Sequence, residues 1–231
     1  MLLALIPAED WKAILISLQV SLCAASLCLP VAVAAGWFLA RTEWRGRWLV
    51  ETLVNLPLVM PPIVTGFLLL ILFSPSGWIG YPLHAWFGWD LVLTWQAAVL
   101  ASLVVSFPLA VRPIQIAFQS IDPDLELAAR TLGAGPWVTF CFVSLPLAKR
   151  GLAAGWLLAF ARSLGEFGAT IMVAGNILGE TRTIPLGVFS YVNSPDGIER
   201  AWPLVTVSVL LSCFALFVGY WIERRQERRS R

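Results

Sequence analysis

Two opposite charges, Arg162 and Glu166, stand four residues apart inside a long apolar stretch of this 231-residue chain. At the centre of a bilayer each would cost roughly 2.5–3.5 kcal/mol on insertion scales, so each needs a partner. A spacing of four places both side chains on one helix face, where they can neutralise each other. Alternatively, Arg162 lends positive potential to an anion path, or the pair forms part of a gate. Ser163 and Thr170 lie near the same stripe and could offer hydroxyl groups.

A second candidate for the same path is the pair Pro61–Pro62, which interrupts another apolar stretch. Proline has no N–H to donate, so two backbone hydrogen bonds of a helix must break there. The freed carbonyls or the kink could shape a path, and a simple packing kink is equally consistent with the sequence. Thr65 follows one turn later and completes the candidate path residues.

Motifs for enzymatic chemistry are absent from the sequence. It contains no G-x-x-x-x-G-K-[ST] phosphate loop, no G-x-S-x-G and no H-E-x-x-H. His84 is the one histidine, and the four cysteines form neither a C-x-x-C pair nor a Cys/His spacing typical of zinc. We therefore predict that the chain is not an enzyme and binds no metal or cofactor itself. An intramembrane enzyme would need paired catalytic groups at similar depth, and Arg162 and Glu166 are poor candidates.

The composition is that of an integral membrane protein, with 58% hydrophobic and 13% charged residues. Soluble domains are roughly 45–50% apolar and about 25% charged. The net charge of +2, without a basic patch among aromatic residues, argues against nucleic acid as a partner. About 20 apolar residues cross a bilayer as a helix. The stretches that qualify are roughly 13–40, 50–73, 91–111, 151–175 and 201–222.

The positions of Lys and Arg in the links predict the orientation, because these residues favour the cytoplasmic side. The link after the first stretch is basic, the link after the second contains no Lys or Arg, and the central loop and the C-terminal tail are basic again. We expect an outer N-terminus and a cytoplasmic C-terminus. The segment Thr183–Val192 is too short to cross, so we expect a short or re-entrant helix packed against protein on the outer side. Five spans are predicted, with six as the alternative.

The central loop contains the stretch "DPDLELAARTLGAGPW", residues 122–137, which has the signals of a short amphipathic helix. Asp122 is a good N-cap, Pro123 suits the first helical position, and Gly133 is typical of the position just after a helix. Glu126 and Arg130 have the spacing and order of a favourable ion pair. An apolar stripe recurs with helical spacing at Leu125, Ala128, Ala129 and Leu132.

A helix of about ten residues is marginal alone in water, and something must cover its apolar stripe. One interpretation is that it lies on the bilayer or on the protein's own helix bundle. The other is that it docks onto a cytoplasmic partner protein.

The stretch "ELAARTLGAGPWVTFCFVSLPL" resembles the cytoplasmic EAA loop of permease subunits of ATP-binding-cassette importers. The family pattern is an acid, two alanines, a glycine and a final leucine-proline pair, matched here by Glu126, Ala128, Ala129, Gly133 and Leu145–Pro146. Leu127 departs mildly, because the family often has alanine there. The resemblance implies that the short helix docks into a groove of a nucleotide-binding subunit and transmits its closure. The docking residues it implies are Asp124, Leu125, Glu126, Ala128, Ala129, Leu132 and Gly133.

Over about residues 11–222, the chain is similar to molybdate-transport permeases. The likeness is carried by "NLPLVMPPIVTGFLLL", "AFARSLGEFGATIMVAGN" and "GETRTIPLGVF". Sulfate and thiosulfate permeases share the Arg-x-x-Gly-Glu core, so these anions and tungstate stay open as cargo. A secondary transporter is a remote alternative, since it would be expected to show inverted repeats and midplane acids.

This resemblance implies an all-α, polytopic type I importer permease fold in a bacterial inner membrane. The transmembrane domain is expected over residues 11–222, with a coupling loop at about 112–150 and a short basic tail at 223–231. The expected partners are a second copy of the chain, two ATPase subunits that use ATP and Mg²⁺, and an extracytoplasmic molybdate-binding protein. The family's permeases form the translocation path, and high affinity for cargo resides largely in the binding protein.

Overall fold

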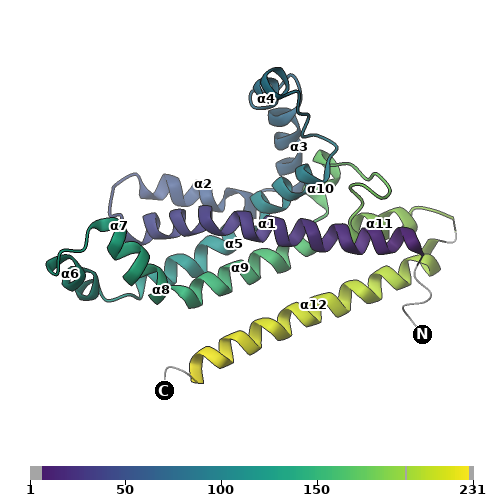
Figure 1. Ribbon diagram of the computed structural model, residues 1–231. Coiled ribbons are helices and arrows are strands. Elements are labelled where there is room, and N and C mark those ends of the chain that lie inside the picture. Colours follow the sequence, from purple (N-terminus) through teal and green to yellow (C-terminus); the bar gives the residue numbers. More distant parts are fainter. Residues whose placement is uncertain (1–6, 196, 229–231) are drawn as a thin grey trace.

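The computed structural model describes residues 7–195 and 197–228, and all regular elements within these ranges are helical (Figure 1). The predicted all-α fold is therefore confirmed. Three helices contain segments long and apolar enough to cross a membrane, namely Glu9–Arg41, Trp95–Gln119 and Gly197–Gly219. They belong to α1 (Ala8–Arg41), α5 (Trp95–Gln119) and α12 (Gly197–Arg228).

The body of the protein is a bundle of α1, α5 and α9 (Lys149–Leu164). Small residues let these helices approach closely, as the spacing of Gly151, Gly155 and Ala159 predicts. A Cβ added to Gly155 would stand 2.7 Å from the carbonyl oxygen of Ala110 in α5. Ala159 is completely buried. The long helix α12 runs along one side of this bundle (Figure 1), and its apolar window is only 17% buried.

The second expected span, 50–73, is broken at Pro61–Pro62, where the sequence predicts the loss of two backbone hydrogen bonds. Helices α2 (Arg47–Val59) and α3 (Pro62–Phe73) meet at a bend of 111°. Met60 and Pro61 between them have extended backbone conformations. Proline cannot continue the hydrogen-bond ladder, and the residue before it is driven out of the helical region. Taken as one bent span, this pair is a fourth candidate crossing.

The fourth expected span is also broken, so 151–175 is not one helix either. Helix α9 ends at Leu164, and α10 (Gly168–Val173) starts after three non-helical residues. Gly165 is the C-cap of α9. Within the described residues, length and composition support three or four crossings, against the five predicted.

The two breaks pack against each other, because α3 contacts α10. A Cβ on Gly66 of α3 would stand 2.7 Å from the backbone of Ala169 in α10. A Cβ on Gly168 would stand 2.9 Å from the Cβ of Pro62. The two breaks therefore lie in contact, while Pro61 and Gly165 themselves stay exposed.

The segment expected to be short forms α11 (Ile184–Val192), a nine-residue helix packed against α12 and α1. Its first N–H donates to Oγ of Ser17 at 2.7 Å, and the phenol of Tyr191 donates to Oδ1 of Asp10 at 2.9 Å. Burial and the hydrogen bond to Asp10 raise the pKa of Tyr191 to about 12. The phenol therefore stays protonated and remains a donor at neutral pH. The helical part of this prediction is confirmed.

Short helices occupy the two longest links. The link after α3 contains α4 (Gly80–Phe87), which projects from the body beside α3 (Figure 1). The loop after α5 contains α6 (Pro123–Thr131), α7 (Pro136–Thr139), the π-helix η2 (Phe140–Ser144) and α8 (Leu145–Leu147). Helices α6 and α7 lie at the end of the bundle where α1 ends, opposite α11 (Figure 1).

The close approach of α9 to α5 predicts the effect of one methyl group. Gly155→Ala should destabilise the fold by about 1–3 kcal/mol, since backbone atoms must move to admit the Cβ. Thermal unfolding of the purified chain in detergent would measure it. Gly135→Ala is the matched control, because its Cβ would meet no atom within 4 Å. Equal unfolding midpoints for the two variants would contradict the packing argument.

Candidate functional site

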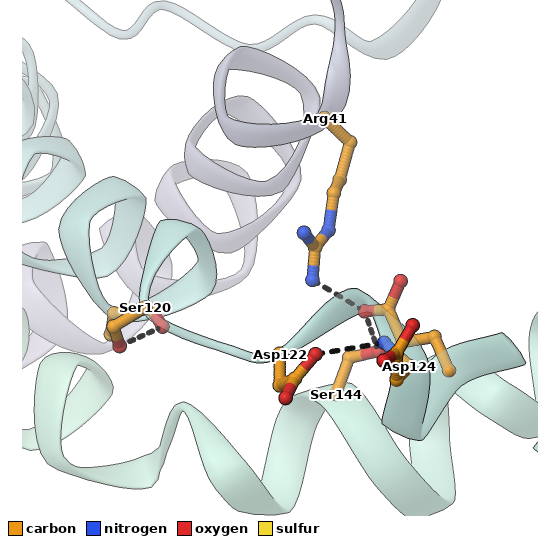
Figure 2. Close-up of polar contacts among 7 residues, drawn as sticks. Arg41, Ser120, Asp122, Asp124 and Ser144 are labelled. Carbon is orange, nitrogen blue, oxygen red and sulfur yellow. Dashed lines mark hydrogen bonds and ion pairs between the residues drawn. The ribbon is translucent and has the colours of Figure 1, made fainter. Parts of the chain in front are cut away.

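The start of α6 is determined by the residues predicted to set it. The side chain of Asp122 accepts a hydrogen bond from the backbone N–H of Asp124 at 3.0 Å, and Pro123 is the first helical residue. An N-cap of this kind satisfies one of the free N–H groups at the helix start. Figure 2 shows this contact beside the end of α1.

The end of α6 is also determined by residues that are neighbours in the sequence. Gly133 has a φ of +89°, in the left-handed region that favours glycine. Its N–H donates to the carbonyl of Arg130 at 3.0 Å, and the N–H of Ala134 donates to the carbonyl of Ala129 at 3.0 Å. These two bonds form a Schellman motif, which closes the helix. The prediction that Gly133 stops this helix is confirmed.

Glu126 joins α6 to the rest of the protein. Its Oε1 accepts from Nη2 of Arg41 at 2.7 Å and from Oγ of Ser144 at 2.7 Å (Figure 2). The side chains of Arg41 and Glu126 are 23% and 15% exposed, so this ion pair is largely shielded from water. The ion pair suggested by sequence spacing, Glu126 with Arg130, is replaced by this contact. Sequence spacing could not identify Arg41, which is 85 residues away.

This junction brings together the last residue of α1, the middle of α6 and the last residue of η2. Charge-assisted hydrogen bonds of this length are stronger than neutral ones. The acceptor Glu126 fixes one face of α6 to the bundle. A π-helical segment such as η2 is a rare local form that often occurs at functional sites.

The opposite face of α6 is exposed. Leu125 is 49% exposed and Leu132 is 89% exposed, while Ala128 is also exposed and Ala129 is half-buried. The predicted docking stripe is therefore divided, with Ala129 closer to the bundle than its neighbours. The other predicted docking residues, Asp124 and Gly133, are exposed as well. An apolar face of this kind, held out from the body by Glu126, is suited to contact with another protein.

The candidate path residues Arg162 and Glu166 form an ion pair of 2.8 Å. Glu166 lies in the break between α9 and α10, and its Oε1 also accepts from the N–H of Ala169 at 2.8 Å. Its side chain is 2% exposed, whereas that of Arg162 is 30% exposed. The self-neutralised pair favoured by the spacing is confirmed, although the helix ends before Glu166.

Three buried hydroxyl groups lie on the elements around this break. Thr65 of α3, Ser163 of α9 and Thr170 of α10 are each at most 5% exposed. Within residues 7–195 and 197–228, no hydrogen-bond partner is found for these three side-chain oxygens. Pro61 and Pro62 stand at the bend where α3 begins, next to Gly168. The structure thus places the predicted path residues on α3, α9 and α10 and at the breaks beside them, and their role in a path stays a prediction.

Comparison with known proteins identifies the kind of protein to which this arrangement belongs. A family model described as "Binding-protein-dependent transport system inner membrane component" matches residues 32–231. The chain belongs to this family. It is a multi-pass inner-membrane permease component, and not the ATPase, of a transport system.

Individual relatives agree with this assignment. The permease is 44% identical over 221 residues to the molybdenum transport system permease protein ModB of Escherichia coli (strain K12), covering 96% of each chain. It is 35% identical over 217 residues to the sulfate transport system permease protein CysW of Synechocystis sp., covering 90% of this chain and 76% of that one.

The fold is also found in solved structures. A chain of a bacterial ABC transporter involved in the import of the polysaccharide alginate matches with a TM-score of 0.69 at 17% identity. The match covers 97% of the permease and 81% of that chain. The likeness confirms the expected importer permease fold.

The junction at Glu126 predicts how firmly α6 is held. Glu126→Ala should accelerate hydrogen exchange of the α6 backbone amides at least tenfold, since a hydrogen bond to a charged group contributes about 1.5–3 kcal/mol. Arg41→Ala should have a similar effect, and the double variant should exceed neither single variant by much, because both remove one interaction.

Asp124→Ala is the control, because the Asp124 side chain takes no part in that junction. Unchanged exchange in Glu126→Ala would mean that other contacts hold α6.

The pair at the break predicts a non-additive effect. Arg162→Gln should destabilise the permease by about 3 kcal/mol, because it leaves the buried carboxylate of Glu166 without its cation. Adding Glu166→Gln should recover part of that loss. The measurement is the unfolding midpoint of the purified variants. A double variant that is less stable than Arg162→Gln would contradict the pairing.

Proposed function

We propose that this permease is the membrane subunit of an ATP-driven importer of molybdate. The observation that carries the proposal is the exposed apolar face of α6, held out from the bundle by the Arg41–Glu126–Ser144 junction. The cargo is supported by the greater identity to the molybdenum permease, 44% against 35% for the sulfate permease. Tungstate and sulfate are the alternative cargoes, because all three are tetrahedral dianions.

The face of α6 docks onto a separate ATPase subunit, which uses ATP and Mg²⁺. Leu125, Ala128 and Leu132 supply the apolar contact, and the small side chain of Ala128 permits close approach. Because Glu126 binds α6 to α1 and η2, a displacement of the docked helix is transmitted to the bundle. The helix is therefore suited to transmit closure of the ATPase to the membrane domain.

Two copies of the permease line one path along a shared axis, and each carries one ATPase. A symmetric pair of this kind places two docking helices on the same side. The N-terminus lies outside and the C-terminus in the cytoplasm. In support, α6, the basic end of α1 and the end of α12 gather at one end of the protein (Figure 1). A binding protein delivers the anion at the opposite end.

Transport proceeds by alternating access. A loaded binding protein docks outside, ATP draws the two α6 helices together and the path opens outward, and hydrolysis resets it. The groups that meet the anion are Arg162 and the hydroxyls of Thr65, Ser163 and Thr170 at the helix breaks. Glu166 neutralises Arg162, so this path holds an anion weakly and lets it pass.

The test is uptake of labelled molybdate by cells that lack their own importer and receive this permease with its binding protein and ATPase. Tungstate should suppress uptake, and excess sulfate should not. Uptake suppressed equally by sulfate would show that the importer does not select molybdate over sulfate. Absence of uptake with all subunits assembled would reject molybdate as the cargo.

Ala128→Arg tests the docking helix in the same cells. It should abolish assembly with the ATPase and uptake while leaving expression unchanged, because the exposed position tolerates a charge in the free permease but not in an apolar contact. Glu43→Arg, on the exposed link after α1, is the control. Full uptake by Ala128→Arg would show that α6 is not the docking site.

A further inference from the structure

A second feature of the α6 end of the protein is an apolar groove of about 960 Å³. Its walls come from the last turns of α1, from α7 and η2, and from α9. Pro30, Ala34 and Trp37 are among its lining residues on α1, and Trp137 and Phe140 face them from the other wall. Its volume is at the upper end of the range for small-molecule sites.

One charged side chain lines this groove, that of Arg130 on α6. Arg130 is exposed, and no ion pair within the described ranges includes it, because Glu126 is engaged by Arg41. The groove therefore combines an apolar wall with a guanidinium group that has no carboxylate partner. Such a site selects an amphiphile with an anionic head and an apolar tail.

The dimensions of the groove fit one leaflet of a bilayer. Its lining on α1 runs from Leu29 to Phe38, which is about 14 Å along a helix. Half of the hydrocarbon core is about 15 Å thick. The aromatic residues at its Arg130 end are those expected at a membrane interface, with the rings of Trp37 and Trp137 at 5.5 and 5.7 Å from that of Phe140.

We propose that this groove binds an anionic phospholipid, with its acyl chains along α1 and its phosphate on Arg130. The single charged group, Arg130, at one end of a long apolar wall matches an occupant with one anionic head and long apolar chains, so charge complementarity favours the lipid. The orientation in the proposed function places this lipid in the cytoplasmic leaflet. There it braces α6 and the α6–α7 turn against α1, beside the Glu126 junction.

Native mass spectrometry of the purified full-length permease, alone and assembled with its ATPase, tests the proposal. Dioleoyl phosphatidylglycerol and dioleoyl phosphatidylcholine are titrated in parallel. The permease should retain phosphatidylglycerol in preference, in both states. Arg130→Gln should weaken phosphatidylglycerol binding about fivefold, the effect of one basic residue at a lipid surface, and leave phosphatidylcholine unchanged. Arg45→Gln, which removes a charge from the exposed link after α1, should change neither.

A second pair of variants tests the apolar wall. Ala34→Trp fills the groove from an exposed position on α1 and should lower retention of both lipids. Leu22→Trp, also exposed on α1 but outside the groove, should lower neither. Circular dichroism and gel filtration confirm that each variant is folded.

Three results would overturn the lipid site. They are equal retention of the two lipids, an equal effect of Arg45→Gln and Arg130→Gln, and loss of the lipid on assembly with the ATPase, which would assign the groove to a protein. Lipid retention is measured without transport. A permease that binds phosphatidylglycerol but takes up no molybdate would therefore contradict the proposed function and leave the lipid site standing.

Discussion

The bilayer allows no unpaired backbone N–H or C=O group in contact with lipid, and this constraint explains where the permease is irregular. The helices break at Met60–Pro61 and again between Leu164 and Gly168. The two broken regions lie against each other, because Gly66 admits the backbone of Ala169 and Gly168 admits Pro62. The carboxylate of Glu166 satisfies one of the N–H groups left free at the start of α10. The polar region inside the membrane domain therefore lies where two broken helices meet.

Helix α9 connects the Glu126 junction of α6 with the break between α9 and α10. Helix α9 begins at Lys149, shortly after the η2 residue Ser144 that binds Glu126, and ends next to Glu166. Its 16 residues span about 24 Å. Gly155 lets α9 pack closely against α5, so that an added Cβ there would clash with the backbone of Ala110. In the proposed function, a bundle packed in this way carries a displacement at α6 toward the breaks. This is the mechanical requirement for an importer that opens its path from the cytoplasmic side.

The sequence was sufficient wherever a structural feature depends on neighbouring residues. The bounds of α6 follow from Asp122, Pro123 and Gly133, which act through their own backbone and the next few residues. The unbroken span 151–175 was wrong because hydropathy averages over a window and does not register a break in the helix. Pro61–Pro62 signalled a break but not a bend of 111°. The ion pair between Glu126 and Arg41 depends on tertiary packing over 85 residues, and no local pattern contains it.

The sequence left three interpretations of Arg162, namely a locked pair, a source of positive potential and part of a gate, and the geometry shows how the first two can be combined. Glu166 is buried and held from two sides, by Arg162 and by the N–H of Ala169. Arg162 is the more exposed partner, and its long side chain can leave the carboxylate more easily than Glu166 can move. In the proposed transport cycle, an oxyanion competes with Glu166 for this guanidinium group. The carboxylate pairs with Arg162 again once the anion has passed, so the path does not trap its cargo and buried Glu166 lacks its cation only during passage.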